Sequence, residues 1–239
     1  MDDAALRFSG VAKTYAGVPA LSEFSLEVRR GEFFGLVGVN GAGKTTLLKC
    51  LLDFCEADGG SISIFGTPHR ATTARARLAY LPERFNPPFY LSGRDFVRYM
   101  LELYRTPYDE ARVRGLFGAL DLDLAALDRP ARVYSKGMTQ KLGLAACLLS
   151  GKDLYVLDEP TGGLDPRARA LLKAELKALK SAGHTVFFTS HALADVAEMC
   201  DRLAVLHAGR LRFAGTPREM LARHQAPDLE QAFLSCIAA

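Results

Sequence analysis

The chain has 239 residues with a formal net charge of +3, and 49% of its residues are hydrophobic and 24% charged. This composition is ordinary for a globular protein with an apolar core, and the length suits one large domain or one domain with an insertion. The basic residues are scattered along the chain, which gives little support for nucleic-acid binding. The acidic start and the lack of a run of ~18 apolar residues predict neither a signal peptide nor a membrane span. If the protein works at a membrane, we expect another chain to supply the span.

The cysteine pattern predicts free thiols. The five cysteines are Cys50, Cys55, Cys147, Cys200 and Cys236, and none forms a C-x-x-C pair. Unpaired cysteines of this kind are typical of a reducing cytosol.

The chain opens with two predicted strands. Residues 6–8 and 24–28 alternate apolar and polar side chains, as half-buried strands do. Between them Tyr15 precedes a turn at Gly17, where its ring could be exposed. An exposed aromatic ring can stack on a purine base, although packing at a strand end is the ordinary alternative.

A glycine-rich loop follows the next predicted strand, the apolar run of residues 33–37. Its residues are Gly38, Val39, Asn40, Gly41, Ala42, Gly43, Lys44 and Thr45, which fit G-x-x-x-x-G-K-[ST], and residues 46–52 after it read as a helix that begins at Thr46. Glycines let backbone N–H groups wrap a phosphate at a helix N-terminus. Lys44 can then reach the β- and γ-phosphates and Thr45 can ligate Mg²⁺, so the loop predicts a nucleoside-triphosphate site.

The middle of the chain changes from strands to helices. Residues 61–65 and 78–83 read as strands, and the Asn-Pro-Pro sequence at 86–88 continues neither a helix nor a central strand. Apolar residues then recur at helical spacing; they are Val97, Met100, Leu101, Tyr104, Val113, Leu116, Phe117 and Leu120. This pattern predicts a helical insertion in an α/β core.

The core resumes after residue 150. Residues 154–157 are a continuous apolar run, as a strand buried on both faces is, and residues 185–189 read as another buried strand. Between them Asp165 and Pro166 are placed to begin a helix and Gly183 to end it. A helix over 192–200 and strands over 203–206 and 210–213 complete the chain. Strands that alternate with helices predict a parallel sheet with both faces covered.

Charged residues stand where two of these strands end. Asp158 and Glu159 follow the run at 154–157, and His191 follows the run at 185–189. Parallel sheets bind ligands at this carboxyl edge, which the phosphate loop also leaves. We expect Asp158 to hold Mg²⁺ and Glu159 to polarise an attacking water. A histidine at such a junction either contacts the γ-phosphate or Glu159, or simply caps the helix.

A second anion site is predicted where Ser135 and Gly137 open an apolar helix. Because the phosphate loop already holds this chain's triphosphate, the second site would serve the nucleotide of another copy. The alternative is an ordinary capped helix.

Together these residues resemble the ATPase subunit of an ATP-binding-cassette (ABC) transporter over nearly the whole chain. The motifs that carry the resemblance occur in the family's order: Tyr15 at the adenine-stacking position, the phosphate loop, Ser135-Lys136-Gly137-Met138 at the signature position, residues 154–159 as Walker B, Gly162-Gly163-Leu164-Asp165 as the D-loop and His191 as the switch histidine.

The resemblance implies an α/β fold: a P-loop NTPase (RecA-like) core with a mostly parallel sheet, an antiparallel β subdomain and an α-helical insertion. It implies one ABC ATPase domain over 1–239, with its core in 1–85 and 151–239 and its helical subdomain in 86–150. ATP and Mg²⁺ are the implied cofactors, with Thr46 and Glu83 added to the nucleotide contacts and Glu83 to the Mg²⁺ ligands.

The implied partners are a membrane permease and a second ATPase subunit. In such a head-to-tail dimer, each ATP lies between one phosphate loop and the Ser135 region of the other subunit, with Asp165 nearby. ATP binding closes the dimer, and hydrolysis reopens it. The permease docks near residues 83–104, which places the protein on the cytoplasmic face of the cell membrane.

Three departures from the common motifs carry information. Lys136 and Met138 replace a Gly and a Gln of the signature, Glu83 stands where many members have Gln, and Gly162-Gly163 replaces Ser-Ala. Together with the tail at 228–234, the first two resemble bacterial exporter ATPases that pair with separate permeases.

Other classes of protein remain as alternatives. A soluble ABC ATPase acting on ribosomes or DNA usually has two cassettes or a long coiled-coil insertion. A small-molecule kinase would leave Ser135, Asp165 and His191 unexplained, and a non-catalytic cassette does not fit intact Glu159 and His191. The sequence does not identify the cargo, because the permease selects it.

Overall fold

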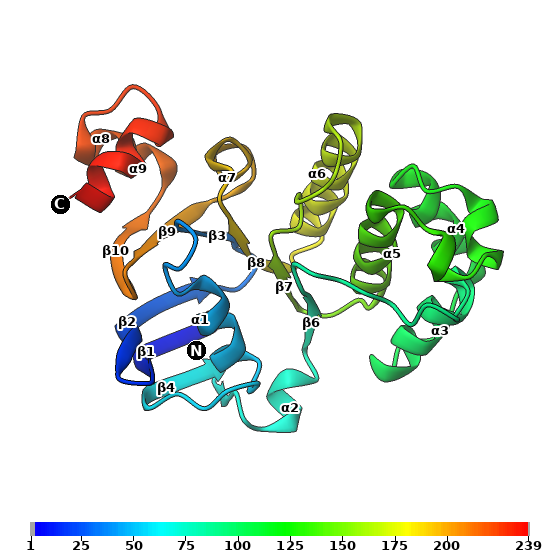
Figure 1. Ribbon diagram of the computed structural model, residues 1–239, viewed down its shortest axis with the longest axis horizontal. Helices are drawn as coiled ribbons and strands as arrows, with labels where there is room; N and C mark the ends of the chain where they lie inside the picture. The colour runs from blue at the N-terminus through cyan, green and yellow to red at the C-terminus, as the bar shows by residue number, and fades with distance from the viewer. Residues whose placement is uncertain (1–2, 239) are drawn as a thin grey trace.

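The computed structural model describes residues 3–238, which form two β-sheets and surrounding helices (Figure 1). The strands are β1 Ala4–Tyr15, β2 Val18–Arg29, β3 Phe33–Val37, β4 Gly59–Ile64, β5 Thr67–Pro68, β6 Leu78–Leu81, β7 Leu154–Asp158, β8 Thr185–Ser190, β9 Arg202–His207 and β10 Arg210–Gly215. The α-helices are α1 Lys44–Leu51, α2 Thr72–Arg75, α3 Gly93–Leu103, α4 Glu110–Ala119, α5 Lys136–Leu149, α6 Pro166–Ser181, α7 Leu193–Met199, α8 Pro217–His224 and α9 Leu229–Ala238, with 3₁₀ turns η1 Leu124–Asp128 and η2 Ala131–Val133.

The six-stranded sheet has the order β10-β9-β3-β8-β7-β6. Every neighbouring pair is parallel except β9 and β10, which form an antiparallel hairpin. The phosphate loop therefore leaves the sheet beside the ends of β7 and β8, because all three strands run in the same direction. The predicted fold class is confirmed.

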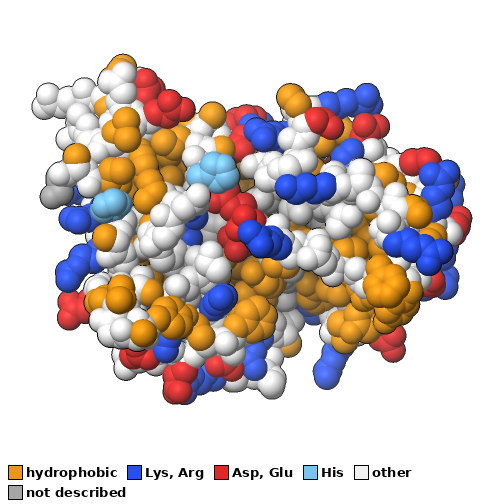
Figure 2. Space-filling view, viewed as in Figure 1, with side chains coloured by type: hydrophobic (Ala, Val, Ile, Leu, Met, Phe, Trp, Pro, Cys, Tyr) orange, Lys and Arg blue, Asp and Glu red, His pale blue; other side chains and the backbone are white. Residues whose placement is uncertain are grey.

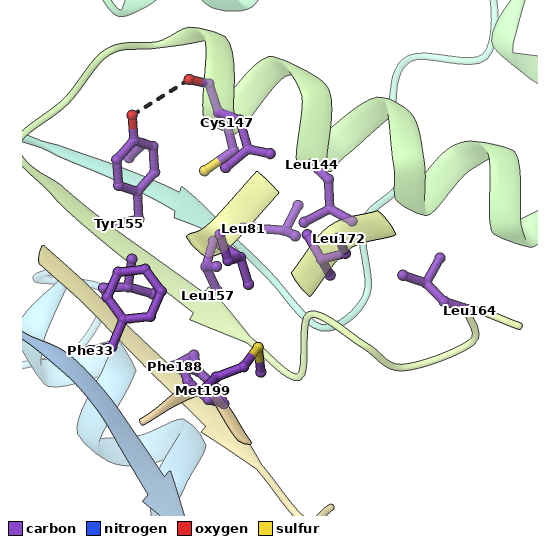
Figure 3. Packing of buried hydrophobic residues seen from close by; sticks show 14 of the residues in the cluster. Phe33, Leu81, Leu144, Cys147, Tyr155, Leu157, Leu164, Leu172, Phe188 and Met199 are labelled. Carbon is purple, nitrogen blue, oxygen red and sulfur yellow. Dashed lines mark hydrogen bonds between the residues drawn. The ribbon is translucent and has the colours of Figure 1, made fainter. Parts of the chain in front are cut away.

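Both faces of this sheet are covered. On one face Tyr155, Leu157 and Phe188 pack against helices α5, α6 and α7, as Figure 3 shows for Leu144, Leu172 and Met199. On the other face Phe34, Val156 and Phe187 pack against α1 and the antiparallel sheet, where the ring centroids of Phe34 and Phe187 lie 6.0 Å apart. Alternate residues of each strand thus enter opposite cores, which explains the continuous apolar runs.

The antiparallel sheet has the order β2-β1-β4-β5. Its first strand is longer than the alternation at residues 6–8 indicates, because β1 continues through register shifts as far as Tyr15. The hairpin between β1 and β2 turns through Ala16 and Gly17, both with positive φ. Tyr15 therefore lies at the tip of this hairpin and is 45% exposed.

Helices α3, α4 and α5 group at one side of the molecule, on the right in Figure 1. The predicted periodicities fall on α3 and α4, whose side chains Val97, Leu101, Val113 and Phe117 are buried. Arg94 of α3 links these segments, because it forms ion pairs with Glu110 of α4 and with Asp128. The boundaries at residues 86 and 150 stay a prediction.

The ends of α6 are those predicted. Asp165 caps the helix by accepting a hydrogen bond from the N–H of Ala168 at 2.9 Å, and Pro166 is its first residue. Gly183 follows the last turn with a φ of +83°. Within residues 3–238, no helix combines the length and the hydropathy that a membrane crossing requires.

Candidate nucleotide-binding and catalytic site

The phosphate loop is fixed by close backbone packing. Gly43, which precedes α1, has a φ of +112°, and a Cβ atom there would lie 2.6 Å from the carbonyl oxygen of Ala20. A Cβ atom on Gly38 would lie 2.5 Å from the carbonyl oxygen of Leu206. Glycine is therefore required at both positions for steric reasons. Helix α1 begins at Lys44, two residues earlier than the predicted Thr46, so the N-terminus of α1 lies within the loop.

Lys44 is buried within this loop. Its Nζ donates a hydrogen bond to the carbonyl oxygen of Gly38 at 2.5 Å and lies 3.7 Å from Oε1 of Glu159. The ammonium group thus connects the phosphate loop to the end of β7. The phosphate loop and the end of β7 are far apart in the sequence, and the order of the strands in the sheet brings them together.

Thr189 connects the two carboxylates that end β7. Its Oγ1 donates a hydrogen bond to Oδ1 of Asp158 at 2.5 Å and accepts one from the N–H of Glu159 at 3.0 Å. Asp158 and Thr189 are register partners in the β7–β8 ladder. Sequence reasoning did not identify Thr189. The sequence feature that could have identified it is a polar residue near the end of a buried strand, next to Phe187 and Phe188.

Glu159 has a constrained backbone and two polar partners. Its φ is +49°, in the left-handed region that non-glycine residues seldom occupy and that is often found at functional sites. Its Oε2 lies 2.8 Å from Nδ1 of His191 and accepts a hydrogen bond from the His191 N–H at 3.3 Å. The carboxylate is buried, whereas the His191 side chain is 68% exposed.

Burial raises the pKa of Asp158 above its ordinary value. The negative charges of Glu83 and Glu159 raise this pKa further, while the Thr189 hydrogen bond and the Lys44 charge oppose the increase. Ionised Asp158 is therefore costly in the folded chain, and a bound cation would relieve that cost.

These residues surround one cleft of about 280 Å³. Its lining consists of Ala20, Val39, Asn40, Gly41, Ala42, Gly43, Lys44, Thr45, Thr46, Glu83, Asp158, Glu159 and His191. Figure 2 shows acidic side chains and a histidine gathered in the hollow near the centre of this face. The structure thus brings together most of the predicted site residues. Gly38 contributes its carbonyl oxygen rather than lining the cleft.

A second cleft continues from the first past three shared residues. Glu83, Glu159 and His191 line both, and the second is also lined by Lys136, Gln140, Gly162 and Gly163. Gly163 has a φ of +75°, and a Cβ atom there would lie 3.1 Å from Cε of Lys136. The unusual lysine of the signature segment therefore lies beside the unusual glycine of the D-loop.

Besides Gly38, four predicted nucleotide contacts lie outside both cleft linings: Tyr15, Ser135, Gly137 and Asp165. Ser135 caps α5 by accepting a hydrogen bond from the N–H of Met138 at 3.2 Å, and Asp165 caps α6. Tyr15 donates a hydrogen bond to Sγ of Cys55 at 3.5 Å. Their roles toward a nucleotide stay predictions.

The donor atoms in the cleft fit Mg²⁺. Thr45, Asp158 and Glu83 offer hydroxyl and carboxylate oxygens, the hard ligands that this ion prefers. Within residues 3–238, no cluster of three or more His, Cys, Asp and Glu side chains could hold a metal ion.

A parallel sheet, a phosphate loop at its carboxyl edge and adjacent acidic residues define a P-loop nucleotide-binding protein. Residues 21–162 match the ABC transporter family model, and the chain belongs to that family. It is 41% identical over 210 residues to an uncharacterized ABC transporter ATP-binding protein of Synechocystis sp., a match that covers 85% of this chain and 58% of that protein.

Two further proteins are matched over a larger share of their own length. The chain is 35% identical to Nod factor export ATP-binding protein I of Ralstonia nicotianae, covering 95% of this chain and 72% of that protein. A solved ATP-binding subunit of an ABC transporter superposes with a TM-score of 0.86 at 28% identity, covering 97% of this chain and 99% of that one. The chain spans less than two thirds of the Synechocystis protein and of a second relative from Nostoc sp., of which it covers 62%.

Proposed function

We propose that the protein binds and hydrolyses ATP, and that this reaction drives export through a separate membrane permease. The observation that carries the proposal is the convergence of Lys44, Asp158, Glu159 and His191 on one cleft from three segments of the chain. Membership of the ABC transporter family supports it. The ATPase acts on the inner face of the cell membrane.

Nucleotide binding follows from the loop and from Lys44. The backbone N–H groups at the start of α1 cradle the phosphates. A triphosphate replaces Gly38 and Glu159 as the partner of the Lys44 ammonium. Thr45, Asp158 and Glu83 would hold Mg²⁺, and the bound ion would supply charge neutralisation at the phosphate oxygens.

Glu159 orients the attacking water and accepts a proton from it. Once Lys44 contacts phosphate, the Oε1 atom of Glu159 loses its ion pair and is free to accept a hydrogen bond. His191 holds Oε2 through both its ring and its backbone N–H, which fixes the direction of the carboxylate. The positive φ of Glu159 has the same effect on the backbone.

The second ATPase subunit completes each site. Ser135 and Gly137 at the N-terminus of α5 face the γ-phosphate bound by the other copy, Asp165 supports the contact, and Tyr15 stacks on adenine. Ser135, Gly137 and Asp165 lie outside the clefts of the single chain, as residues that act on a partner's nucleotide would. Ser135 already caps α5, so that helix presents an ordered N-terminus.

The permease docks on an apolar groove near α3. The groove has a volume of about 540 Å³, and its apolar lining includes Phe54, Tyr80, Met100, Leu103 and Tyr104. Hydrophobic side chains gather over the region of α3 in Figure 2. Phe89 and Tyr90 of the preceding loop are each 66% exposed. Tyr80 of the groove belongs to β6, the strand that leads to Glu83 of the nucleotide cleft, and this segment can transmit the state of the nucleotide to the permease.

Export, rather than import, is supported by the relative from Ralstonia nicotianae, which is named Nod factor export ATP-binding protein I. The proposed function concerns export in general, because the permease determines the cargo.

The test uses Glu159→Gln, tagged and expressed in cells, with the wild type as a matched control. With ATP present, the variant is expected to bind nucleotide, release no phosphate above background and co-purify from solubilised membranes with a multi-span protein that lacks its own cassette. Undiminished phosphate release contradicts the role of Glu159. Ribosomes or DNA in place of a membrane protein overturn the transport assignment and favour a soluble ABC ATPase.

A further inference from the structure

Two cysteine sulfurs lie in contact at the C-terminal end of α1, the helix that follows the phosphate loop. Cys50 is a buried residue of α1, and Cys55 lies in the loop that follows the helix. Their Sγ atoms are 3.6 Å apart, and neither forms a disulfide. Both belong to the core on the α1 side of the sheet, whereas Cys147, Cys200 and Cys236 belong to the core on the opposite face.

The backbone fixes this approach. After α1, Asp53 adopts a φ of +62°, and the N–H groups of Phe54 and Cys55 both donate to the carbonyl oxygen of Lys49, at 2.8 and 3.3 Å. The chain therefore folds back over the last turn of the helix and places Cys55 against Cys50. The backbone turn that ends α1 therefore determines this contact, in addition to the side-chain rotamers of the two cysteines.

The two thiols differ in reactivity. Burial, with a contribution from the neighbouring Cys55, raises the pKa of Cys50 to about 12, so this thiol stays protonated. Cys55 is only half-buried and can meet a small oxidant. Cys55 is therefore the thiol that an oxidant reaches first, and Cys50 is a second thiol within 3.6 Å of it, where it can resolve an oxidised Cys55.

Cys55 also contacts the predicted adenine-stacking residue. The Tyr15 hydroxyl donates to its Sγ at 3.5 Å, and this hydrogen bond raises the pKa of Tyr15. The Lys13 ammonium also lies against this ring, 5.4 Å from its centroid. Cys55 is thus a support for the exposed tip of the β1–β2 hairpin.

We propose that Cys50 and Cys55 are a thiol modification site that hydrogen peroxide converts to a reversible disulfide, and that the disulfide weakens nucleotide binding by releasing Tyr15. The first half rests on geometry alone; the second half rests on the proposed function.

The reaction balances with one peroxide. The Cys55 sulfur attacks a peroxide oxygen, the O–O bond breaks, and Cys55 becomes a sulfenic acid as one water leaves. The Cys50 sulfur then attacks the Cys55 sulfur; an S–S bond forms, the S–O bond breaks, and the Cys50 proton leaves with the hydroxyl as a second water. Two thiols lose two electrons in total, and the peroxide gains them. A thiol reductant reverses the change.

Disulfide formation would affect Tyr15 because it moves the Cys55 sulfur away from the Tyr15 hydroxyl. The sulfurs must close from 3.6 Å to about 2.05 Å. Because Cys50 is anchored in α1, most of the movement falls on Cys55, which lies in the loop. Its sulfur moves toward α1, and the Tyr15 hydroxyl loses its partner.

The experiment treats purified full-length protein with hydrogen peroxide and maps its tryptic peptides without reduction. Cys50 and Cys55 share the peptide that spans residues 50–70, because no Lys or Arg lies between them and Arg70. We expect this peptide to lose two hydrogen atoms and to resist alkylation. Cys55→Ser and Cys50→Ser should prevent the change, and Cys236→Ser should not. Two alkylated thiols in the oxidised wild type overturn the proposal.

Calorimetry with ATP then tests the consequence on the same samples. Oxidation is expected to weaken binding roughly 2- to 10-fold, the range of one aromatic contact, and reductant should restore it. A disulfide that leaves the affinity unchanged overturns the link to Tyr15, as does an equal loss in oxidised Cys55→Ser. If reduced protein binds no ATP, the proposed function fails, while the peptide map still decides whether the disulfide forms.

Discussion

At the scale of single residues, the site combines charges that folding alone does not favour. Asp158 is a buried carboxylate beside Glu83 and Glu159, and burial is the first cause of its raised pKa. Thr189 gives it one hydrogen bond, and Lys44 partly offsets its charge. A side chain in this setting costs stability, which is expected where it serves to bind a cation.

Replacing Asp158 by Asn should therefore stabilise the nucleotide-free protein at neutral pH. A carboxyl group with a raised folded-state pKa stays protonated in the folded chain after the unfolded chain has ionised. Stability is thus lost as the pH rises from the usual value of 3.8 through the folded-state pKa, and the whole cost is present at pH 7. Asparagine keeps the acceptor for Thr189 without the charge. We expect Tm to rise by roughly 2–4 °C for each kcal/mol recovered.

The measurement is thermal unfolding of Asp158→Asn and wild type across a pH series. The gain should shrink as the pH falls toward the usual carboxyl range, because wild-type Asp158 is then protonated as well. Asp153→Asn is the matched control, since Asp153 is an exposed carboxylate paired with Arg77 at 2.8 Å and should change Tm little. A lower Tm for Asp158→Asn at pH 7 contradicts the explanation.

At the scale of elements, three helices have side-chain caps at their N-termini. Asp165 caps α6, Ser135 caps α5 and Asp109 caps α4, each by accepting hydrogen bonds from the first turn. The hydrogen bond from the Ala168 N–H holds the pKa of Asp165 below its usual range. Structural caps and nucleotide contacts use the same chemistry, so the cap alone does not separate the two roles.

Asp165→Ala and Asp109→Ala should separate them. Each loses an N-cap, and we expect each to lower Tm by roughly 2–4 °C. Only Asp165→Ala should also lower ATP turnover, because Asp165 belongs to the D-loop and Asp109 lies in the helical group. The check is phosphate release measured at a temperature where both variants are folded. Equal turnover in the two variants would assign Asp165 a purely structural role.

At the scale of the whole molecule, an apolar groove beside α3 remains exposed although both cores are closed. Leu103 of the groove is 60% exposed, and Leu234 of α9, in a different part of the fold, is 61% exposed. Two leucines with equal exposure provide a direct comparison, since a change at either perturbs the folded chain to a similar extent.

Leu103→Glu should reduce recovery of the membrane partner at least about tenfold, because docking would bury an unpaired charge. Leu234→Glu is the control and should retain the partner. ATP affinity should be unchanged in both, since neither residue lies in a cleft. The readout is the amount of multi-span protein recovered with each variant in the Glu159→Gln background. Full recovery with Leu103→Glu would place the docking surface elsewhere.

The sequence by itself determined the elements and the chemistry of the motifs. Apolar runs predicted β3, β7 and β8, and helical spacing predicted α3 and α4, because periodicity reflects which faces are buried. The phosphate loop was recognisable because its glycines and Lys44-Thr45 occur at a fixed spacing between a predicted strand and a predicted helix. The α6 boundaries followed from cap and proline chemistry, which is also local.

Only the tertiary structure decided which of these residues meet. Sheet order placed β8 between β3 and β7, and that arrangement brings Thr189 to Asp158 and His191 to Glu159. Packing of the β1–β2 hairpin against the loop after α1 also put Tyr15 against Cys55, a contact with no sequence signature. Hydrogen bonds and thiol contacts between distant segments depend on register and packing, and no local pattern encodes them.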